Sequence, residues 1–280
     1  MAHTASLQLG LIGDNIAQSR APLLHRLAGD QNGIAVRYDR LVPPARGESF
    51  DQVFDHCAKS GFRGINITYP YKERAVARAH ITDPLVRAIG AINTVIFDGG
   101  APQGFNTDYT GFMAAYRAGR GTQAPGKVLM IGTGGVGRAV AFGLVGLGVS
   151  ELRLIDRDTA KAEALAKDLA THAPEVAVIV CTDTEEAARG ATGLINCTPV
   201  GMTGYDGTPL PRSAMGDATW AFDAVYTPTD TQFLTDATAE GLHIISGWEL
   251  FFYQGVHAWA LFSGTSVDQA ALRQALLKAG

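Results

Sequence analysis

Cysteine is scarce in this sequence of 280 residues, which holds three of them, Cys57, Cys181 and Cys197. An odd number of cysteines, with no Cys-x-x-Cys pair and no histidine at ligand spacing, argues against a disulfide framework and against a structural zinc site. Unpaired cysteines are typical of a reducing compartment. We therefore expect a cytoplasmic protein that binds no metal.

Long apolar runs and an excess of one charge are also absent. The longest apolar stretch, residues 139–149, has about half the length of a membrane span and is interrupted by glycine. No charged segment followed by an apolar one opens the chain, so we expect no secretory signal. The 23 Lys and Arg against 27 Asp and Glu give a net charge of −4. This balance favours neither a nucleic-acid surface nor a membrane surface.

Glycine and apolar side chains, by contrast, are plentiful. Apolar residues make up 46% of the chain and charged residues 18%, a composition typical of a globular protein with a sizeable core. The 33 glycines amount to about 12%, against a usual ~7%, and indicate many tight turns or backbone packed close to a ligand. The length indicates one large domain or two modest ones.

Short apolar runs alternate with segments of helical periodicity along the chain, an order typical of an α/β protein. The predicted strands are residues 7–12, 36–42, 62–67, 91–97, 127–131, 151–155, 176–181 and 193–196. The predicted helices are residues 22–29, 48–59, 70–79, 110–118, 136–147, 159–170, 248–262 and 266–279. The turn Asp98-Gly99-Gly100 indicates a hairpin or a sheet edge. The polar stretch 119–126 reads as a linker, and the regular alternation after it predicts a parallel, doubly wound sheet.

A glycine-rich turn follows the predicted strand 127–131 directly and precedes the predicted helix 136–147. Its sequence is Gly132-Thr133-Gly134-Gly135-Val136-Gly137, which matches the pattern GxGxxG. One glycine makes the tight turn, a second lets backbone N–H groups approach a pyrophosphate, and a third permits close packing of helix on strand. The helix N-terminus would face the phosphates. This context predicts that residues 132–137 bind a dinucleotide, with Gly132, Gly134, Gly135, Val136 and Gly137 as its contacts.

An acidic residue stands where dinucleotide sites of this kind hold the ribose. Asp156 follows the predicted strand 151–155, and a carboxylate there accepts hydrogen bonds from the ribose hydroxyls and repels a 2′-phosphate. Asp156 therefore predicts NAD rather than NADP. Arg157 is the contrary signal, because its guanidinium could hold a 2′-phosphate, whereas Asp158 adds negative charge to the same loop. Alternatively, Asp156, Arg157 and Asp158 are charged residues of a solvent-exposed turn that binds no ligand.

Three segments of the N-terminal half carry further polar residues at predicted strand ends and turns. They read GINITYPYKERAV at 64–76, GAINTV at 90–95 and GFNTDYTGF at 104–112. Lys72 falls on the first turn of the predicted helix 70–79, and Asn93 and Asp108 lie at strand ends or turns. Such positions converge on a crevice in α/β sheets, where a lysine and an aspartate would form a proton-transfer pair at an alcohol. An ordinary surface salt bridge is the alternative.

Together with motifs of the second half, these segments resemble the shikimate/quinate dehydrogenase family nearly from end to end. The matching motifs are Asn66-Ile67-Thr68-Tyr69-Pro70-Tyr71-Lys72, Ala91-Ile92-Asn93-Thr94, Gly104-Phe105-Asn106-Thr107-Asp108, Asn196-Cys197-Thr198-Pro199-Val200-Gly201-Met202, Asp223-Ala224-Val225-Tyr226-Thr227-Pro228 and the late Gln254. The resemblance implies an N-terminal α/β substrate-binding catalytic domain over residues 1–111, completed by the C-terminal helices of residues 248–280. Residues 112–247 would form a Rossmann-type, doubly wound NAD-binding domain.

The resemblance also implies roles for individual residues. Lys72 would be the catalytic acid and base at the ring hydroxyl that becomes a ketone, and Asp108 would hold that hydroxyl and orient Lys72. The substrate-binding residues would be Ser19, Thr68, Asn93, Thr107, Tyr226 and Gln254. The cofactor-binding residues, besides residues 132–137, would be Asp156, Arg157, Thr198, Pro199, Val200, Gly247 and Leu250.

Two departures from the family pattern bear on the reaction. Ala21 stands where the family's Ser-x-Ser-Pro motif has its second serine, so one hydroxyl donor for the substrate carboxylate is missing. The run Asp156-Arg157-Asp158 replaces the Asn-Arg-Thr of the NADP-using biosynthetic branch and is similar to the NAD-using quinate/shikimate branch. The resemblance thus implies NAD-dependent oxidation of the 3-hydroxyl of quinate or shikimate.

Other readings and the expected partners complete the prediction. The alternatives are an NADP-dependent biosynthetic shikimate dehydrogenase, a relative that acts on an amino analogue, or a non-catalytic NAD-binding sensor. The expected partner is a small cyclohexane or cyclohexene polyol carboxylate, with no nucleic acid and no membrane. We expect a monomer or a homodimer.

Overall fold

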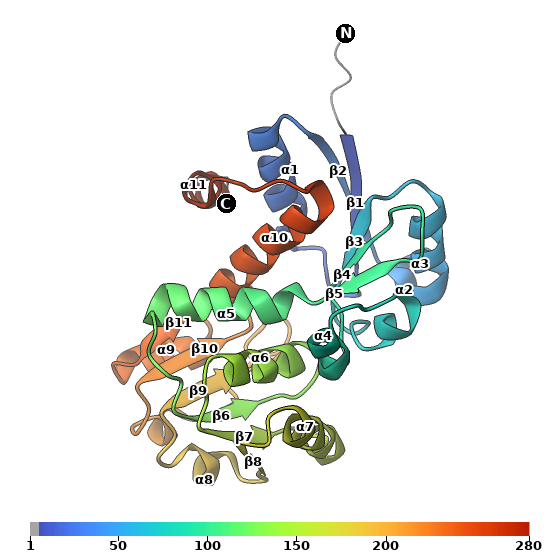
Figure 1. The fold of residues 1–280 in the computed structure, drawn as a ribbon. Coiled ribbons are helices and arrows are strands. Elements are labelled where there is room, and N and C mark those ends of the chain that lie inside the picture. Colours follow the sequence, from blue (N-terminus) through green and yellow to red (C-terminus); the bar gives the residue numbers. More distant parts are fainter. Residues whose placement is uncertain (1–5, 280) are drawn as a thin grey trace. The chain divides into compact units, whose positions relative to one another are not determined.

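Two β-sheets, each with its own helices, organise the chain into two units (Figure 1). The computed structural model describes residues 6–279. The first unit comprises the described residues up to Thr107 and those from Gln254 onward, and the second runs from Asp108 to Tyr253. The predicted α/β class with two units is confirmed, whereas the domain limits at 111/112 and 247/248 stay a prediction. Within residues 6–279 no helix has the length and apolar character that crossing a membrane requires.

The first sheet is mixed. Its strands are β1 (Ser6–Ile12), β2 (Ala35–Leu41), β3 (Gly64–Ile67), β4 (Thr94–Ile96) and β5 (Gln103–Phe105). They lie in the order β2-β1-β3-β4-β5, with β1 parallel to both β2 and β3. The β3–β4 and β4–β5 pairs are antiparallel, so the hairpin predicted from the turn Asp98-Gly99-Gly100 is confirmed.

The helices of this unit start and end at recognisable signals. They are α1 (Ala21–Asn32), α2 (Pro43–Arg46), α3 (Phe50–Lys59), the 3-10 helix η1 (Arg74–Arg78), α4 (Pro84–Ile89), the C-terminal part of α10 (Gly247–Ser263) and α11 (Gln269–Lys278). Ser49 caps α3: its hydroxyl accepts from the N–H of Gln52, whose side chain accepts from the N–H of Ser49 at 2.8 Å. α1 ends at Gly33, whose φ of 65° is left-handed backbone that glycine adopts without strain.

Strand β3 shows how the first core is divided between the two faces of the sheet. Ile65 and Ile67 belong to a buried cluster with Phe50 and Phe54 of α3. Because side chains alternate along a strand, Asn66 points to the other face, where α1 and α10 lie (Figure 1). A Cβ at Gly64 would lie 2.5 Å from the ring of Phe262 in α10, so glycine is required for this close packing.

The second sheet is parallel throughout and doubly wound, as predicted. Its strands are β6 (Lys127–Ile131), β7 (Glu151–Ile155), β8 (Ala177–Val180), β9 (Gly193–Asn196), β10 (Trp220–Asp223) and β11 (His243–Ile245). Their order is β11-β10-β9-β6-β7-β8. The chain runs outward from β6 to β8 and then returns to β9 on the other side of β6. The carboxyl ends of β6 and β9 therefore form the switch point at which such sheets bind ligands.

The remaining helices belong to the second unit. They are most of α5 (Thr107–Arg120), α6 (Gly135–Gly146), α7 (Thr159–His172), α8 (Thr184–Ala188), the 3-10 helix η2 (Arg212–Ala214), α9 (Gln232–Ala239) and the first turns of α10. The stretch 119–126 connects α5 to β6 inside this unit. The indole N–H of Trp220 in β10 donates to Pro125 of that stretch at 3.1 Å.

The predicted helix 70–79 is wrong. Only Arg74–Arg78 is helical, as the 3-10 helix η1, and Lys72 lies in the turn before it. The backbone makes turn bonds there, from Tyr71 N–H to Thr68 at 2.9 Å and from Val76 N–H to Glu73 at 3.2 Å, and bonds of this spacing do not build an α-helix.

The sequence prediction also missed several short elements, namely α2, α4, α8, α9, β10 and β11. For α4 a signal was present in the pair Asp83-Pro84. Asp83 caps the helix by accepting from the N–H of Leu85 at 2.8 Å, and Pro84 is its first residue.

His25 of α1 is a titratable group buried in the first unit, where it is 1% exposed. Its ring stacks on Tyr38 with centroids 5.1 Å apart and meets Phe262 edge-on at 5.5 Å. Burial lowers the pKa of His25 to about 3, an effect that a hydrogen bond with Asn66 only partly offsets. The imidazole is therefore neutral in the folded protein.

This burial makes stability depend on pH. Between pH 6.5 and about 3 the unfolded chain binds a proton at His25 and the folded protein does not, so the free energy of unfolding falls as the pH falls. We expect this group to remove up to about 5 kcal/mol across that range. In urea unfolding at several pH values, His25→Phe should lose this part of the slope, whereas His56→Gln, at an exposed position, should keep it. Equal slopes in all three proteins would contradict the assignment.

Candidate active site

The first group of candidate residues lies where β4 begins and α5 starts. Asn93 precedes β4 and is 3% exposed, and Thr107 is the first residue of α5. The amide oxygen of Asn93 accepts from the Thr107 N–H at 2.7 Å, and its Nδ2 donates to Thr107 Oγ1 at 2.9 Å. These two bonds hold the Asn93 amide in one orientation against the first turn of α5.

A second layer of polar side chains stands behind Asn93. Thr94 Oγ1 donates to Asn93 Oδ1 at 3.1 Å and accepts from Asn66 Nδ2 at 3.0 Å, while Asn66 Oδ1 accepts from the Tyr38 hydroxyl at 2.8 Å. Gln254 lies on the near side, with its Oε1 3.5 Å from Thr107 Oγ1. The structure therefore brings Asn93, Thr107 and Gln254 together. It adds Asn66 and Thr94, which the sequence analysis quoted within motifs without giving them a role.

The turn that carries Lys72 is held on its N-terminal side by the contacts of the Tyr71 side chain. Tyr71 stacks on Phe50 of α3, with centroids 5.0 Å apart and the rings 16° from parallel. Its hydroxyl donates to Asp14 Oδ1 at 2.6 Å. Burial and the Asp14 carboxylate raise the pKa of Tyr71 to about 12, so the phenol keeps the proton that makes this bond. The carbonyl of Lys72 itself accepts from the N–H of Ile92 at 3.0 Å.

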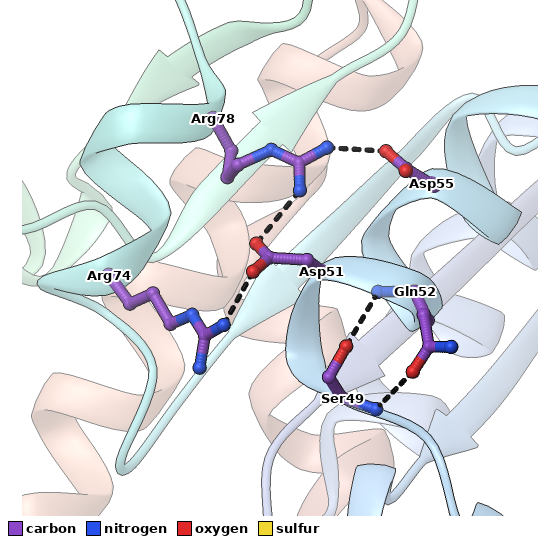
Figure 2. A network of polar contacts seen from close by, with 6 residues as sticks. All are labelled: Ser49, Asp51, Gln52, Asp55, Arg74 and Arg78. Atoms are coloured by element: carbon purple, nitrogen blue, oxygen red, sulfur yellow. Dashed lines mark hydrogen bonds and ion pairs between the residues drawn. The ribbon is translucent and has the colours of Figure 1, made fainter.

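On the C-terminal side of Lys72, η1 is tied to α3 by ion pairs (Figure 2). Asp51 receives both Arg74 and Arg78, and Arg78 also reaches Asp55. The Arg78 guanidinium lies 4.8 Å from the centroid of the Phe54 ring. The two guanidinium groups hold the pKa of Asp51 below its usual range. The turn with Lys72 is thus braced from both sides by one helix.

Asp108 is the second residue of α5 and is 5% exposed. It belongs to the second unit and Lys72 to the first. Their pairing for proton transfer stays a prediction.

Ser19 and Thr68 lie at the carboxyl ends of β1 and β3. Ser19 Oγ accepts from the N–H of Ala21 at 3.3 Å, at the start of α1, and Arg40 donates to the Ser19 carbonyl at 2.7 Å. The Thr68 N–H donates to the last carbonyl of β1 at 2.9 Å. A Cβ at Gly13 would lie 2.3 Å from Thr68 Cγ2, so the two loops meet closely at this edge of the sheet.

In the second unit, the three glycines of the GxGxxG pattern sit in three different environments between β6 and α6. Gly132 has a φ of 98°, and a Cβ there would lie 2.7 Å from the backbone carbon of Cys197. A Cβ at Gly137 would lie 2.2 Å from the Gly132 carbonyl oxygen, as expected for close packing of helix on strand. Gly134, the residue before α6, faces open space. The arrangement leaves room for phosphates in front of a helix N-terminus.

Asp156 follows β7 and faces the same loop. Its Oδ2 accepts from the N–H and the hydroxyl of Thr133, at 2.7 and 2.8 Å, and its Oδ1 accepts from the Asp158 N–H at 3.0 Å. Burial alone would raise the pKa of Asp156, but these hydrogen bonds outweigh it and hold the pKa below its usual value. The group is therefore an anion at neutral pH. Arg157, next to it, is exposed.

The other predicted cofactor residues of this unit lie on two further segments. Thr198, Pro199 and Val200 form the loop after β9, in which Val200 N–H donates to Thr198 Oγ1 at 3.1 Å. Gly247 and Leu250 lie in the first turns of α10, and a Cβ at Gly247 would lie 2.3 Å from the Val225 carbonyl oxygen. The predicted substrate residue Tyr226 stacks on Phe251 of α10, with centroids 5.0 Å apart.

Comparison with known proteins gives consistent results over the whole chain. Residues 11–95 match the family described as the shikimate dehydrogenase substrate binding domain. A quinate/shikimate dehydrogenase (NAD(+)) of Corynebacterium efficiens is 37% identical, covering 97% of this chain and 98% of its own. A shikimate dehydrogenase (NADP(+)) of an Arthrobacter species is 35% identical, covering 98% and 95%.

Solved structures similar to this chain belong to the same family. Quinate dehydrogenase from Corynebacterium glutamicum in complex with NAD has a TM-score of 0.89 at 34% identity and covers 98% of this chain and 99% of that chain. Shikimate 5-dehydrogenase from Thermus thermophilus in complex with NADP(H) and shikimate has a TM-score of 0.85 at 33% identity, with coverage of 98% and 100%.

The brace around Lys72 can be tested through stability. Asp51→Ala removes both ion pairs to η1, and we expect the free energy of unfolding to fall by about 1 kcal/mol, since half-exposed pairs are worth little individually. The loss should shrink in 1 M NaCl, which screens exposed charges. As the control, Glu48→Ala removes an equally short pair with Arg46, two residues away in the chain, and should leave denaturant unfolding unchanged. Equal effects of both substitutions would rule out a bracing role for Asp51.

Proposed function

The chain belongs to the shikimate/quinate dehydrogenase family, and from this premise we propose that it transfers hydride between NAD and the 3-hydroxyl of quinate or shikimate. The products of oxidation are 3-dehydroquinate and 3-dehydroshikimate. The observation that carries the choice of NAD is the ionised Asp156 at the end of β7, beside the glycine-rich loop.

The residues of the second unit fit a dinucleotide. The open space at Gly134 and the N–H groups at the start of α6 suit a pyrophosphate. The Asp156 carboxylate is placed to accept from ribose hydroxyls and to repel a 2′-phosphate. Thr198, Pro199, Val200, Gly247 and Leu250 would complete the site. When bound, NAD supplies the hydride acceptor of the reaction.

The hydroxyl groups of the substrate would be bound by the polar side chains around Asn93. One N–H of the Asn93 amide donates to Thr107, and the other has no partner among residues 6–279, so it can donate to a ligand hydroxyl. Thr107, Gln254 and Thr68 would make the remaining contacts. Because Asn93 is held by several bonds, its free N–H has a fixed direction before the substrate arrives.

The substrate carboxylate would bind at the start of α1. Ser19 accepts the Ala21 N–H and keeps its own hydroxyl proton to donate to an anion, and the helix dipole of α1 favours negative charge at this end. Tyr226 would lie near the same group. Ala21 offers no hydroxyl here, and we propose that the missing donor alters the relative affinity for quinate and shikimate.

Oxidation of a secondary alcohol requires a base that takes the hydroxyl proton as hydride leaves the carbon. We assign this role to Lys72, and to Asp108 the roles of holding the hydroxyl and orienting Lys72. In the reverse direction Lys72 returns the proton to the ketone oxygen.

NADP is the second candidate cofactor, because Arg157 adjoins Asp156 and relatives named for NADP match the chain nearly as well. The anion at Asp156 favours NAD between the two. We also propose that the protein is a monomer or homodimer of the cytoplasm, where its three free cysteines would stay reduced.

The role of Lys72 predicts a specific kinetic change. Lys72→Ala should lower kcat by roughly 10²–10⁴-fold, the usual contribution of a positioned acid–base group, with a much smaller change in KM. Lys59→Ala, an exposed lysine at the end of α3, should leave both constants unchanged. Steady-state assays with quinate and shikimate measure both. A near-normal kcat in Lys72→Ala would remove Lys72 from the mechanism.

Cofactor choice can be tested on one loop. The wild type should use NAD more than about tenfold better than NADP, because a carboxylate near a 2′-phosphate repels it by several kcal/mol in a partly dry site. Asp156→Ala should weaken NAD binding and improve the use of NADP, since Arg157 then faces the phosphate alone.

The controls separate charge from loop shape. Asp158→Ala removes an exposed charge of the same loop and should leave the NAD/NADP ratio unchanged. Thr133→Val removes one donor to Asp156 and should weaken both cofactors equally. If the wild type uses both cofactors equally, or if Asp156→Ala leaves the ratio unchanged, the choice of NAD is wrong.

A further inference from the structure

A buried carboxylate that the proposed reaction does not use lies behind the loop after β9. Asp223 ends β10 and is 0% exposed, and its backbone pairs in register with Asn196 at the end of β9. Three donors converge on it: Asn196 Nδ2 at 3.0 Å, the Val225 N–H at 2.9 Å and the Thr231 hydroxyl at 2.6 Å. All three donors are neutral, and in the part of the chain that the structure describes no salt bridge offsets the burial of this charge.

The hydrogen bonds continue from Asp223 into the loop that the proposed cofactor touches. Asn196 is itself fully buried, and besides Asp223 its Nδ2 donates to the carbonyl of Val200 at 3.0 Å. Its Oδ1 accepts from the N–H and the hydroxyl of Thr198, at 2.9 and 2.7 Å. The Asn196 side chain thus contacts both Thr198 and Val200, and Asp223 supports the orientation in which it does so by accepting from the same Nδ2.

The three donors are shared unequally between the two oxygens of Asp223. Oδ1 accepts from both Asn196 and the Val225 N–H, whereas Oδ2 accepts from the Thr231 hydroxyl, which can itself act as an acceptor. An amide at this position could therefore keep its oxygen on Asn196, but an apolar side chain would leave Asn196 Nδ2 and the Val225 N–H without this acceptor. Loss of the oxygen at residue 223 should therefore be felt at residues 198–200.

The burial of Asp223 costs stability. Burial raises its pKa to about 6, and the hydrogen bonds from Thr231, Val225 and Asn196 offset only part of this effect. Between its ordinary value and about 6, the folded protein holds the proton more tightly than the unfolded chain does, so this group stabilises the fold less as the pH rises. An apolar side chain would not incur this cost, but it would leave the buried Asn196 Nδ2 and the Val225 N–H without the acceptor that Asp223 supplies.

We propose that Asp223 is a positioning residue for the dinucleotide, because its carboxylate orients Asn196 and thereby sets the shape of the 198–200 loop. This inference rests on the proposed function in taking that loop as a cofactor contact.

The test is the affinity of the full-length protein for NAD⁺, measured by calorimetry alongside the thermal midpoint without ligand. Asp223→Leu, which removes both acceptor oxygens, should raise the Kd at least about tenfold. Asp223→Asn, whose amide oxygen can still accept from Asn196 and Val225, should raise it much less, and the thermal midpoints show whether both variants fold. Asp217→Leu is the matched control: this exposed aspartate of the same unit accepts from the Gly190 N–H, and the substitution should leave the Kd unchanged.

The outcomes separate the two proposals. If the wild type binds no NAD⁺ at any pH, the proposed function fails. If the wild type binds NAD⁺ but a folded Asp223→Leu binds it equally well, or if Asp223→Asn loses as much affinity as Asp223→Leu, the proposed function stands and the positioning role of Asp223 is wrong.

Discussion

A buried polar side chain must find its hydrogen-bond partners inside the protein, and both candidate sites of this chain depend on that constraint. In the first unit the amide of Asn93 is held by Thr107 and Thr94. In the second, Asn196 is held by Asp223 and Thr198. In each case the fixed amide lies at the end of a strand, where the sheet opens toward a ligand. Because these groups have little freedom to turn, the donors left over have defined directions before any ligand binds.

The two units stabilise their charged side chains in different ways. Around Lys72 the charged groups are arginine and aspartate pairs between η1 and α3, partly exposed and so of modest energy. In the second unit no salt bridge joins either of the two carboxylates near the proposed cofactor loops to another described residue. Asp156 is stabilised as an anion by backbone N–H groups and a hydroxyl, whereas Asp223 is buried at a cost. This contrast is consistent with a rigid support for a catalytic lysine in one unit and a shaped polar surface for a dinucleotide in the other.

The departures from the family pattern fall at the positions proposed for the ends of the two ligands. Ala21 stands where the family motif has a serine, at the position proposed for the substrate carboxylate, and Asp156 places a negative charge at the position proposed for the cofactor ribose. Asn93, Thr107 and Gln254 keep the family motif. Under the proposed function, this distribution would retain the chemistry of the alcohol and adjust the choice of substrate and cofactor.

The sequence by itself determined the α/β class, the doubly wound second sheet, the glycine-rich turn and the family, because these depend on local periodicity and on residues close together in the chain. Its family resemblance also singled out Asn93, Thr107 and Gln254, which the structure brings together. It gave the wrong helix before and after Lys72, since the turn there is held by Asp14 and by Asp51 and Asp55 of α3, which are distant in sequence. It gave Asn66, Thr94 and Asp223 no role. Only the tertiary structure decided these partners, because the pairing of neighbouring strands places side chains about 27 residues apart, such as Asn196 and Asp223, within one hydrogen bond of each other.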